Sequence, residues 1–100
     1  MVTFIPYYAV IFTSKKNKET SGYELMAEQM VALAQKQPGF IGVDSARNEV
    51  GITVSYWESL EAIKLWKQNT QHLLAQQLGK SDWYAHYKVR ICLVEREYEF

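Results

Sequence analysis

The stretch PGFIGVDSARNEVGITVSYWESLEAIKLW, residues 38–66, changes its hydrophobic period twice and predicts three successive elements. Residues 40–46 and 51–57 alternate or run apolar over the length of a strand, and residues 47–50 supply a polar turn between them. From Ser59, a residue type favoured at helix N-caps, the apolar residues recur at helical spacing. The stretch therefore predicts a β-hairpin followed by a helix.

Upstream of this stretch, the sequence predicts a strand and then a helix. Residues 4–13 are almost continuously apolar, a pattern typical of a strand covered on both faces. Ser21 and Glu24 have the spacing of a capping box, in which a hydroxyl and a carboxylate each satisfy a free N–H at a helix start. Pro38 and Gly39 end that helix, because proline cannot continue it and glycine tolerates positive φ.

Downstream, helical spacing resumes over about residues 70–78, and a last strand is predicted over about residues 86–98. The resulting order is strand, helix, strand, strand, helix, strand within a single domain, residues 1–100. This is the α+β, ferredoxin-like βαββαβ arrangement, with both helices on one face of an antiparallel sheet. The segment VEREYEF, residues 94–100, alternates charged and aromatic residues and is interpreted as an edge strand that reaches across a dimer interface.

The composition favours a partner or a ligand cavity. The chain has 100 residues, of which 48% are hydrophobic and 14% aromatic. A domain of this size buries only about 60 to 70% of the surface that its unfolded chain exposes. Strands that are apolar on both sides indicate that a second copy covers the other face of the sheet. We therefore expect a homodimer whose two sheets pack face to face as an α/β barrel.

Charge and cysteine content exclude several other classes of protein. Eleven basic and eleven acidic residues cancel, so no long-range field favours nucleic acid or an anionic membrane. The apolar run near residues 4–12 is too short to span a bilayer. Cys92, the only cysteine, cannot form an internal disulfide, and with two histidines beside it no zinc-type spacing occurs. We expect a cytoplasmic protein with no nucleic-acid or membrane partner and no metal.

Three features together resemble the antibiotic biosynthesis monooxygenase family of dimeric ferredoxin-like α/β barrels. They are the segment PGFIG at residues 38–42, the segment SYWESLEAI at residues 55–63, and Trp66. The resemblance extends from about Tyr8 to Glu97. It implies one pocket per protomer between the sheet and its helices, where some members oxidise aromatic phenols or quinols with molecular oxygen and no bound cofactor.

Other members of the family bind and degrade haem, and the resemblance argues against that activity here. The haem-degrading branch uses an asparagine on the first strand, a tryptophan on the second helix and a histidine about three turns further on. Trp66 corresponds to the tryptophan. The asparagine region holds Tyr7, Tyr8 and Ala9, and the histidine position falls near Gln76, with His72 about one turn too early. Haem binding is thus the least favoured alternative.

Cofactor-free oxygenation requires a base and aromatic walls around a dry pocket. His72 is the candidate catalytic base, because an imidazole titrates near neutral pH. The aromatic side chains that we expect to bind substrate, together with a guanidinium that could anchor a phenolate or carboxylate, are Tyr8, Tyr56, Trp66, Trp83, Tyr84 and Arg90. Three alternatives stay open. Trp66 packs chiefly in the core, Arg90 pairs with an acidic side chain such as Asp44 or Glu95, and His72 interacts with the helix dipole or stands in solvent.

The predicted function is a cofactor-independent monooxygenase that acts on a planar aromatic small molecule and requires no cofactor. The alternative is a non-catalytic homodimer, either binding a small molecule or purely structural, in which the aromatic side chains fill the pocket.

Overall fold

The computed structural model describes residues 6–16, 23–76 and 84–100, and the side chains within 6–15, 28–70 and 86–100. Six elements follow one another in the order that the sequence predicts, so the ferredoxin-like βαββαβ fold is confirmed. They are β1 (Tyr7–Lys16), α1 (Tyr23–Gln35), β2 (Phe40–Arg47), β3 (Gly51–Trp57), α2 (Leu60–Gln76) and β4 (Tyr84–Val94).

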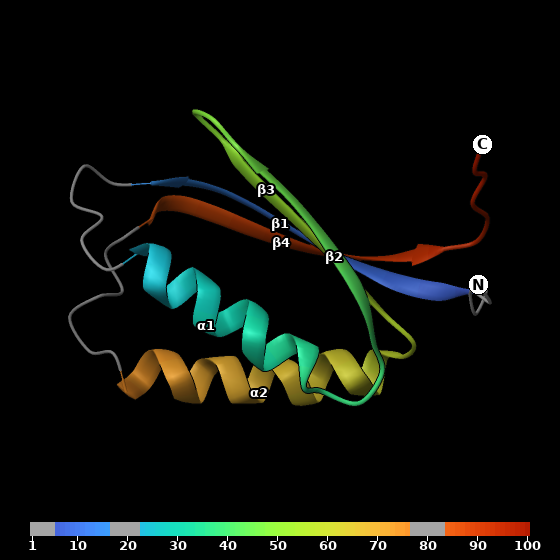
Figure 1. Ribbon diagram of the computed structural model, residues 1–100, viewed down its shortest axis with the longest axis horizontal. Coiled ribbons are helices and arrows are strands. Elements are labelled where there is room, and N and C mark those ends of the chain that lie inside the picture. Colours follow the sequence, from blue (N-terminus) through green and yellow to red (C-terminus); the bar gives the residue numbers. More distant parts are fainter. Residues whose placement is uncertain (1–5, 17–22, 77–83) are drawn as a thin grey trace.

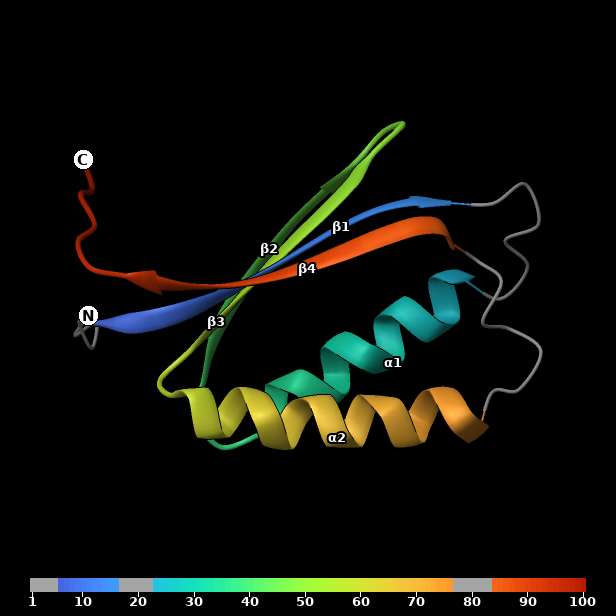
Figure 2. The ribbon, with the colours of Figure 1, turned by 180° about the vertical axis from the view of Figure 1, so that it is seen from behind.

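The four strands form one antiparallel sheet in the order β2-β3-β1-β4. Both helices lie on the same side of this sheet, as the two opposite views in Figures 1 and 2 show. The segment that follows β4 turns away on the other side (Figure 1). The sheet therefore has a helix-facing side, packed by α1 and α2, and a helix-free side.

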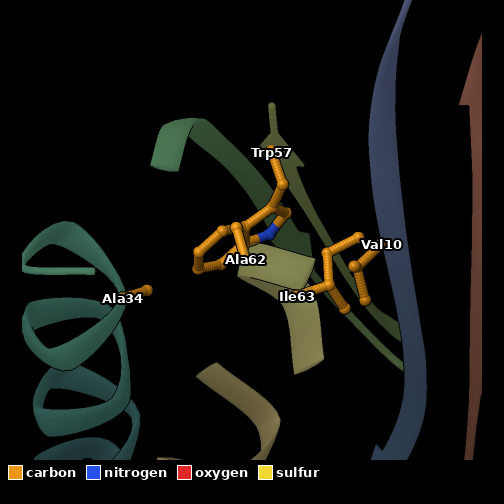
Figure 3. Packing of buried hydrophobic residues seen from close by; sticks show 5 residues of the cluster. All are labelled: Val10, Ala34, Trp57, Ala62 and Ile63. Carbon is orange, nitrogen blue, oxygen red and sulfur yellow. The ribbon is translucent and has the colours of Figure 1, made fainter. Parts of the chain in front are cut away.

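The core lies where the two helices meet β1 and β3. Val10, Ala34, Trp57, Ala62 and Ile63 form a buried cluster (Figure 3), with Trp57 completely buried. The Trp57 indole N–H donates to the hydroxyl oxygen of Ser55 at 2.9 Å, so this polar group carries no desolvation cost. The cluster fixes which residues of each strand face the helices, because strand side chains alternate between the two faces.

A glycine and a serine set the angle at which β2 and α2 approach each other. Gly39 has φ of 84°, as predicted, and its carbonyl accepts a hydrogen bond of 2.8 Å from the N–H of Glu58. A Cβ on Gly39 would lie 2.7 Å from the Cβ of Ala62, so α2 packs against bare backbone here. The Ala62 N–H donates to the Ser59 hydroxyl at 3.1 Å, which confirms the predicted N-cap.

Three predicted boundaries differ from the structure. The second helix runs without interruption from Leu60 to Gln76, and Thr70 is accommodated because its hydroxyl donates to the Lys67 carbonyl at 2.9 Å. Strand β1 extends to Lys16, beyond the predicted end at residue 13. Ser21 of the predicted capping box lies outside the described residues.

The strand predicted over about residues 86–98 is shorter in the structure, where β4 ends at Val94. That residues 94–100 reach across a dimer interface stays a prediction. Val94 pairs with Tyr7, and the residue before Tyr7 is Pro6. Because proline has no N–H, Pro6 cannot donate a ladder hydrogen bond to the residue that follows Val94. The last six residues leave the sheet instead.

Candidate functional site

The helix-facing side of β1 and β4 is the first part of the candidate site. Val10 belongs to the core cluster, so Tyr8 and Phe12, two residues away on either side, share its face. The register then assigns the β4 residues opposite them to this face. They form what we call the β4 strip: Tyr87, Val89, Ile91 and Leu93.

The β4 strip is apolar but not covered. Its four side chains are between 47% and 59% exposed, whereas Val10 on the neighbouring strand is 5% exposed. The core cluster joins α1 and α2 to β1 and β3 and includes no described residue of β4. A contiguous exposed row of large apolar side chains in a small protein indicates a binding surface.

Trp66 contributes a polar group on the same side of the sheet. Its ring packs against Trp57 with centroids 5.1 Å apart, and it lies at the edge of the core cluster. The indole nitrogen is buried and has no hydrogen-bond partner among the described residues. An unpaired buried donor costs about 1–3 kcal/mol, so an acceptor atom that reached this N–H would gain a favourable hydrogen bond.

The far end of this face, towards the β2–β3 turn, combines an aromatic pair with polar groups. The rings of Phe12 and Tyr87 stack with centroids 5.5 Å apart and an interplanar angle of 20°. The guanidinium of Arg47 donates to the hydroxyl of the buried Ser14 and lies over Gly51, where a Cβ would overlap it. Because Gly51 has no side chain, the Arg47 side chain can extend from β2 over β3 and reach Ser14 on β1.

The helix-free side carries a pair of tyrosine–carboxylate contacts. The hydroxyl of Tyr7 donates to Glu97, and that of Tyr56 donates to Asp44 at 2.9 Å. The two rings meet edge to face, with centroids 6.1 Å apart. The hydrogen bond to Glu97, followed by burial, raises the pKa of Tyr7 to about 12. Burial, followed by the hydrogen bond to Asp44, raises the pKa of Tyr56 above its ordinary value.

The Tyr7 contact predicts a pH dependence of stability. Because the folded-state pKa of Tyr7 is raised above the ordinary 10.0, its contribution is complete below pH 10 and is lost as pH rises towards 12. In urea unfolding between pH 9 and about pH 12, wild type should lose stability more steeply than Tyr7→Phe. Tyr98→Phe, which alters an exposed tyrosine, is the control and should follow wild type. Parallel curves for wild type and Tyr7→Phe would contradict this assignment.

The structure divides the predicted site residues between the two faces. Tyr8 and Trp66 lie together on the helix-facing side, against the core cluster. Tyr56 pairs with Ala9 and Arg90 pairs with Ile11, so both lie on the helix-free side. The expectation that all these residues share one pocket between sheet and helices therefore needs correction. The side chains of His72 and Tyr84, and the whole of Trp83, lie outside those described.

Sequence reasoning missed Phe12, Tyr87 and Arg47. Phe12 could have been found by extending the alternation from Tyr8, since both positions have the same parity in one strand. Tyr87 and Arg47 depend on pairing with distant strands, for which the local sequence holds no signal. The Arg90 ion pair with Asp44 or Glu95 is not present in the described part of the chain, where Asp44 accepts from Tyr56 instead.

Other kinds of site find no support in the described residues. Within residues 6–16, 23–76 and 84–100, no three His, Cys, Asp or Glu side chains are grouped so that they could hold a metal ion. None of the helices described is both long and apolar enough to cross a membrane. Two open hollows, of about 280 and 200 Å³, lie along α1 and at the start of α2, and neither contains a predicted site residue.

Comparison with known proteins identifies the family. Residues 6–78 match the model of the antibiotic biosynthesis monooxygenase family. The chain is 51% identical over 94 residues to the uncharacterized protein YqjZ of Bacillus subtilis (strain 168), covering 92% of this chain and 82% of YqjZ. The chain therefore belongs to the antibiotic biosynthesis monooxygenase family.

Solved structures share the fold at low sequence identity. SnoaB, a cofactor-independent oxygenase from Streptomyces nogalater solved in a mutant form, aligns with a TM-score of 0.74 at 10% identity, covering 91% of this chain and 95% of SnoaB. PA3566 from Pseudomonas aeruginosa aligns with a TM-score of 0.71 at 18% identity, covering 97% of this chain and 100% of PA3566. At these identities the likeness concerns the fold alone.

Proposed function

We propose that this protein is a cofactor-independent monooxygenase that oxidises a planar aromatic phenol or quinol with molecular oxygen. The observation that carries the proposal is the exposed β4 strip on the same side of the sheet as the unpaired N–H of Trp66. An apolar wall suits a planar ring, and a buried donor suits an oxygen atom on that ring. Family membership and the oxygenase activity of SnoaB support the same class of reaction.

The chemistry needs little from the protein beyond a base and a shaped, water-poor surface. Removing a proton from an anthrone-type substrate creates an electron-rich anion, which can react with oxygen directly. One oxygen atom then enters the product as a carbonyl, and the second leaves as water with the two hydrogen atoms lost from the reacting carbon. The indole N–H of Trp66 would stabilise the substrate oxyanion, since a preorganised donor is most effective where charge develops.

His72 is the residue that we assign as the base. It lies in the last turns of α2, the helix that also carries Trp66. An imidazole that titrates near neutral pH can accept a proton from a phenolic or activated C–H group at physiological pH. The other histidine, His86, pairs with Lys15 on the helix-free side of the sheet and is exposed. The two histidines thus provide a functional position and a matched control.

The test is oxygen consumption by the purified protein with anthrone or a hydroquinone. Wild type should consume oxygen at a rate well above the uncatalysed reaction. His72→Ala should lose most of the turnover, about 100-fold or more for a general base. His86→Ala should retain wild-type turnover. If His72→Ala turns over at the wild-type rate with its fold unchanged, His72 is not part of the mechanism.

A non-catalytic role is the second candidate, and the packing of Trp66 against Trp57 favours it. In that case Trp66 completes the core, and the β4 strip binds an aromatic molecule without oxidising it. Binding of anthrone detected by tryptophan fluorescence, with no oxygen consumed, would support this alternative over the enzyme.

We also propose that the protein is a homodimer, in which the helix-free sides of two sheets pack together. Ile52 is 45% exposed on this side, and the next row of the sheet carries Val54 and Ile11 at its centre. The family is built on such dimeric barrels, and burying this face would remove apolar surface from water. Native mass spectrometry should give twice the mass of the 11.7 kDa chain.

A further inference from the structure

We infer that the helix-free side of the sheet binds a second copy of the chain in one orientation, with Arg90 of each protomer paired to Asp44 of the partner subunit. This inference rests on the proposed homodimer and adds to it the direction of packing and the contact that selects it. The partner that fits this surface is a second copy of the chain. The surface carries a carboxylate at one edge and cations at the other, so two copies can place opposite charges against each other.

The first observation is a row of four residues that crosses the helix-free side from edge to edge. Asp44 pairs with Val54, Val54 with Ile11, and Ile11 with Arg90. The carboxylate therefore lies on β2, at one edge of the sheet, and the guanidinium on β4, at the other. The two apolar side chains between them form the centre of the surface.

The second observation is that Arg90 has no partner among the described residues of its own protomer. Asp44 and Arg90 are three strand spacings apart, about 14 Å, which is too far for an ion pair. Arg90 is exposed, and nothing in the described residues accepts a hydrogen bond from it. Lys88, two residues earlier on the same edge and face, is also exposed. The β4 edge of this surface is thus positively charged, with no acidic partner in the part of the chain that the structure describes.

The third observation is that Asp44 is held in place and still has accepting capacity. The Tyr56 hydroxyl donates to its Oδ2 at 2.9 Å. A carboxylate offers about four lone-pair directions, so the remaining oxygen can accept from a guanidinium. The Tyr56 bond orients the carboxylate before any partner arrives, which reduces the entropy lost on association.

Symmetry connects these observations. A two-fold axis between the sheets and parallel to the strands exchanges the two edges while keeping each row level. It places Arg90 over Asp44 of the partner subunit twice in the dimer, with Ile11 and Val54 packed between. An axis perpendicular to the strands would instead place equal edges over each other, bringing Arg90 and Lys88 towards the same cations of the partner. Like charges at an interface are strongly disfavoured, so the charges select the first arrangement.

A charge-swap experiment tests the pair. Arg90→Glu and Asp44→Arg each place like charges at both symmetric contacts, and each should raise the dimer dissociation constant at least about tenfold. The double variant restores opposite charges and should return the constant to within about threefold of wild type. Glu61→Lys and Lys64→Glu alter exposed charges on α2, away from this surface, and should leave the constant unchanged. Sedimentation velocity over a concentration series gives the constants, and circular dichroism reports the fold.

Each outcome decides a separate point. A wild-type protein that stays monomeric at tens of micromolar overturns the homodimer and this inference together. A wild-type dimer that neither single variant weakens overturns the pair and leaves the homodimer standing. Single variants that dissociate without rescue in the double variant also overturn the pair. If a charge reversal disturbs the fold, Arg90→Gln is used instead; it should weaken the dimer and reduce its salt dependence, and an unchanged salt dependence overturns the pair.

Discussion

Replacing Trp57 with alanine is expected to lower the free energy of unfolding by about 3 to 5 kcal/mol, the range for large aromatic side chains removed from a core. Trp57 is completely buried, and its ring meets Phe40 at 5.4 Å and Trp66 at 5.1 Å between centroids. The substitution would leave a cavity between both helices and the sheet, and would leave the Ser55 hydroxyl without its donor. Urea unfolding followed by circular dichroism measures the effect.

Leu65→Ala is the control for Trp57→Ala. Leu65 is a large apolar residue of α2, but its side chain is 42% exposed, so its removal should cost less than about 1 kcal/mol. A Trp57→Ala variant as stable as Leu65→Ala would mean that the core is not centred on Trp57.

Replacing Gly39 with alanine is expected to cost about 2 to 4 kcal/mol, for two reasons that add. A left-handed backbone disfavours any residue with a Cβ, and φ here is 84°. The new methyl group would also lie 2.7 Å from the Cβ of Ala62, so α2 or β2 must move. Thermal unfolding of the variant should show a clearly lower midpoint than wild type.

Gly42→Ala is the matched control for Gly39→Ala. Gly42 follows in β2, and a Cβ there would be no closer than 3.9 Å to the Tyr56 ring, an ordinary contact. Its substitution should change stability by less than about 1 kcal/mol. Equal effects at Gly39 and Gly42 would show that the close approach of β2 to α2 does not limit the fold.

The fold could be predicted from the sequence because its local signals agree with one another. The hairpin between Phe40 and Trp57, the N-cap at Ser59 and the glycine at the end of α1 are all read over short distances and all occur in the structure. The end of β4 could not be predicted in this way. It depends on Pro6, about 90 positions away, which ends the strand that β4 pairs with.

The candidate site was less predictable from the sequence. Successive residues of a strand point to opposite faces of the sheet, but the sequence does not show whether the odd-numbered or the even-numbered residues face the helices. Tyr56 and Trp57 are adjacent large aromatics, and only the pairing of Tyr8 with Trp57 shows which of them points inward. The same pairing across β1 places Arg90 on the helix-free side. The missing hydrogen-bond partner of Trp66 is a property of three-dimensional packing and has no signature in the sequence.

The proposed reaction is tested most directly by isotope labelling with oxygen-18 gas. Purified protein, treated with a chelator and supplied with anthrone under labelled oxygen, should form anthraquinone in which the new carbonyl carries one labelled atom. Mass spectrometry of the product should show that label at a rate that scales with protein concentration. Product formed at the protein-free rate, or a new carbonyl whose oxygen comes from water, would contradict the account of this protein as a monooxygenase.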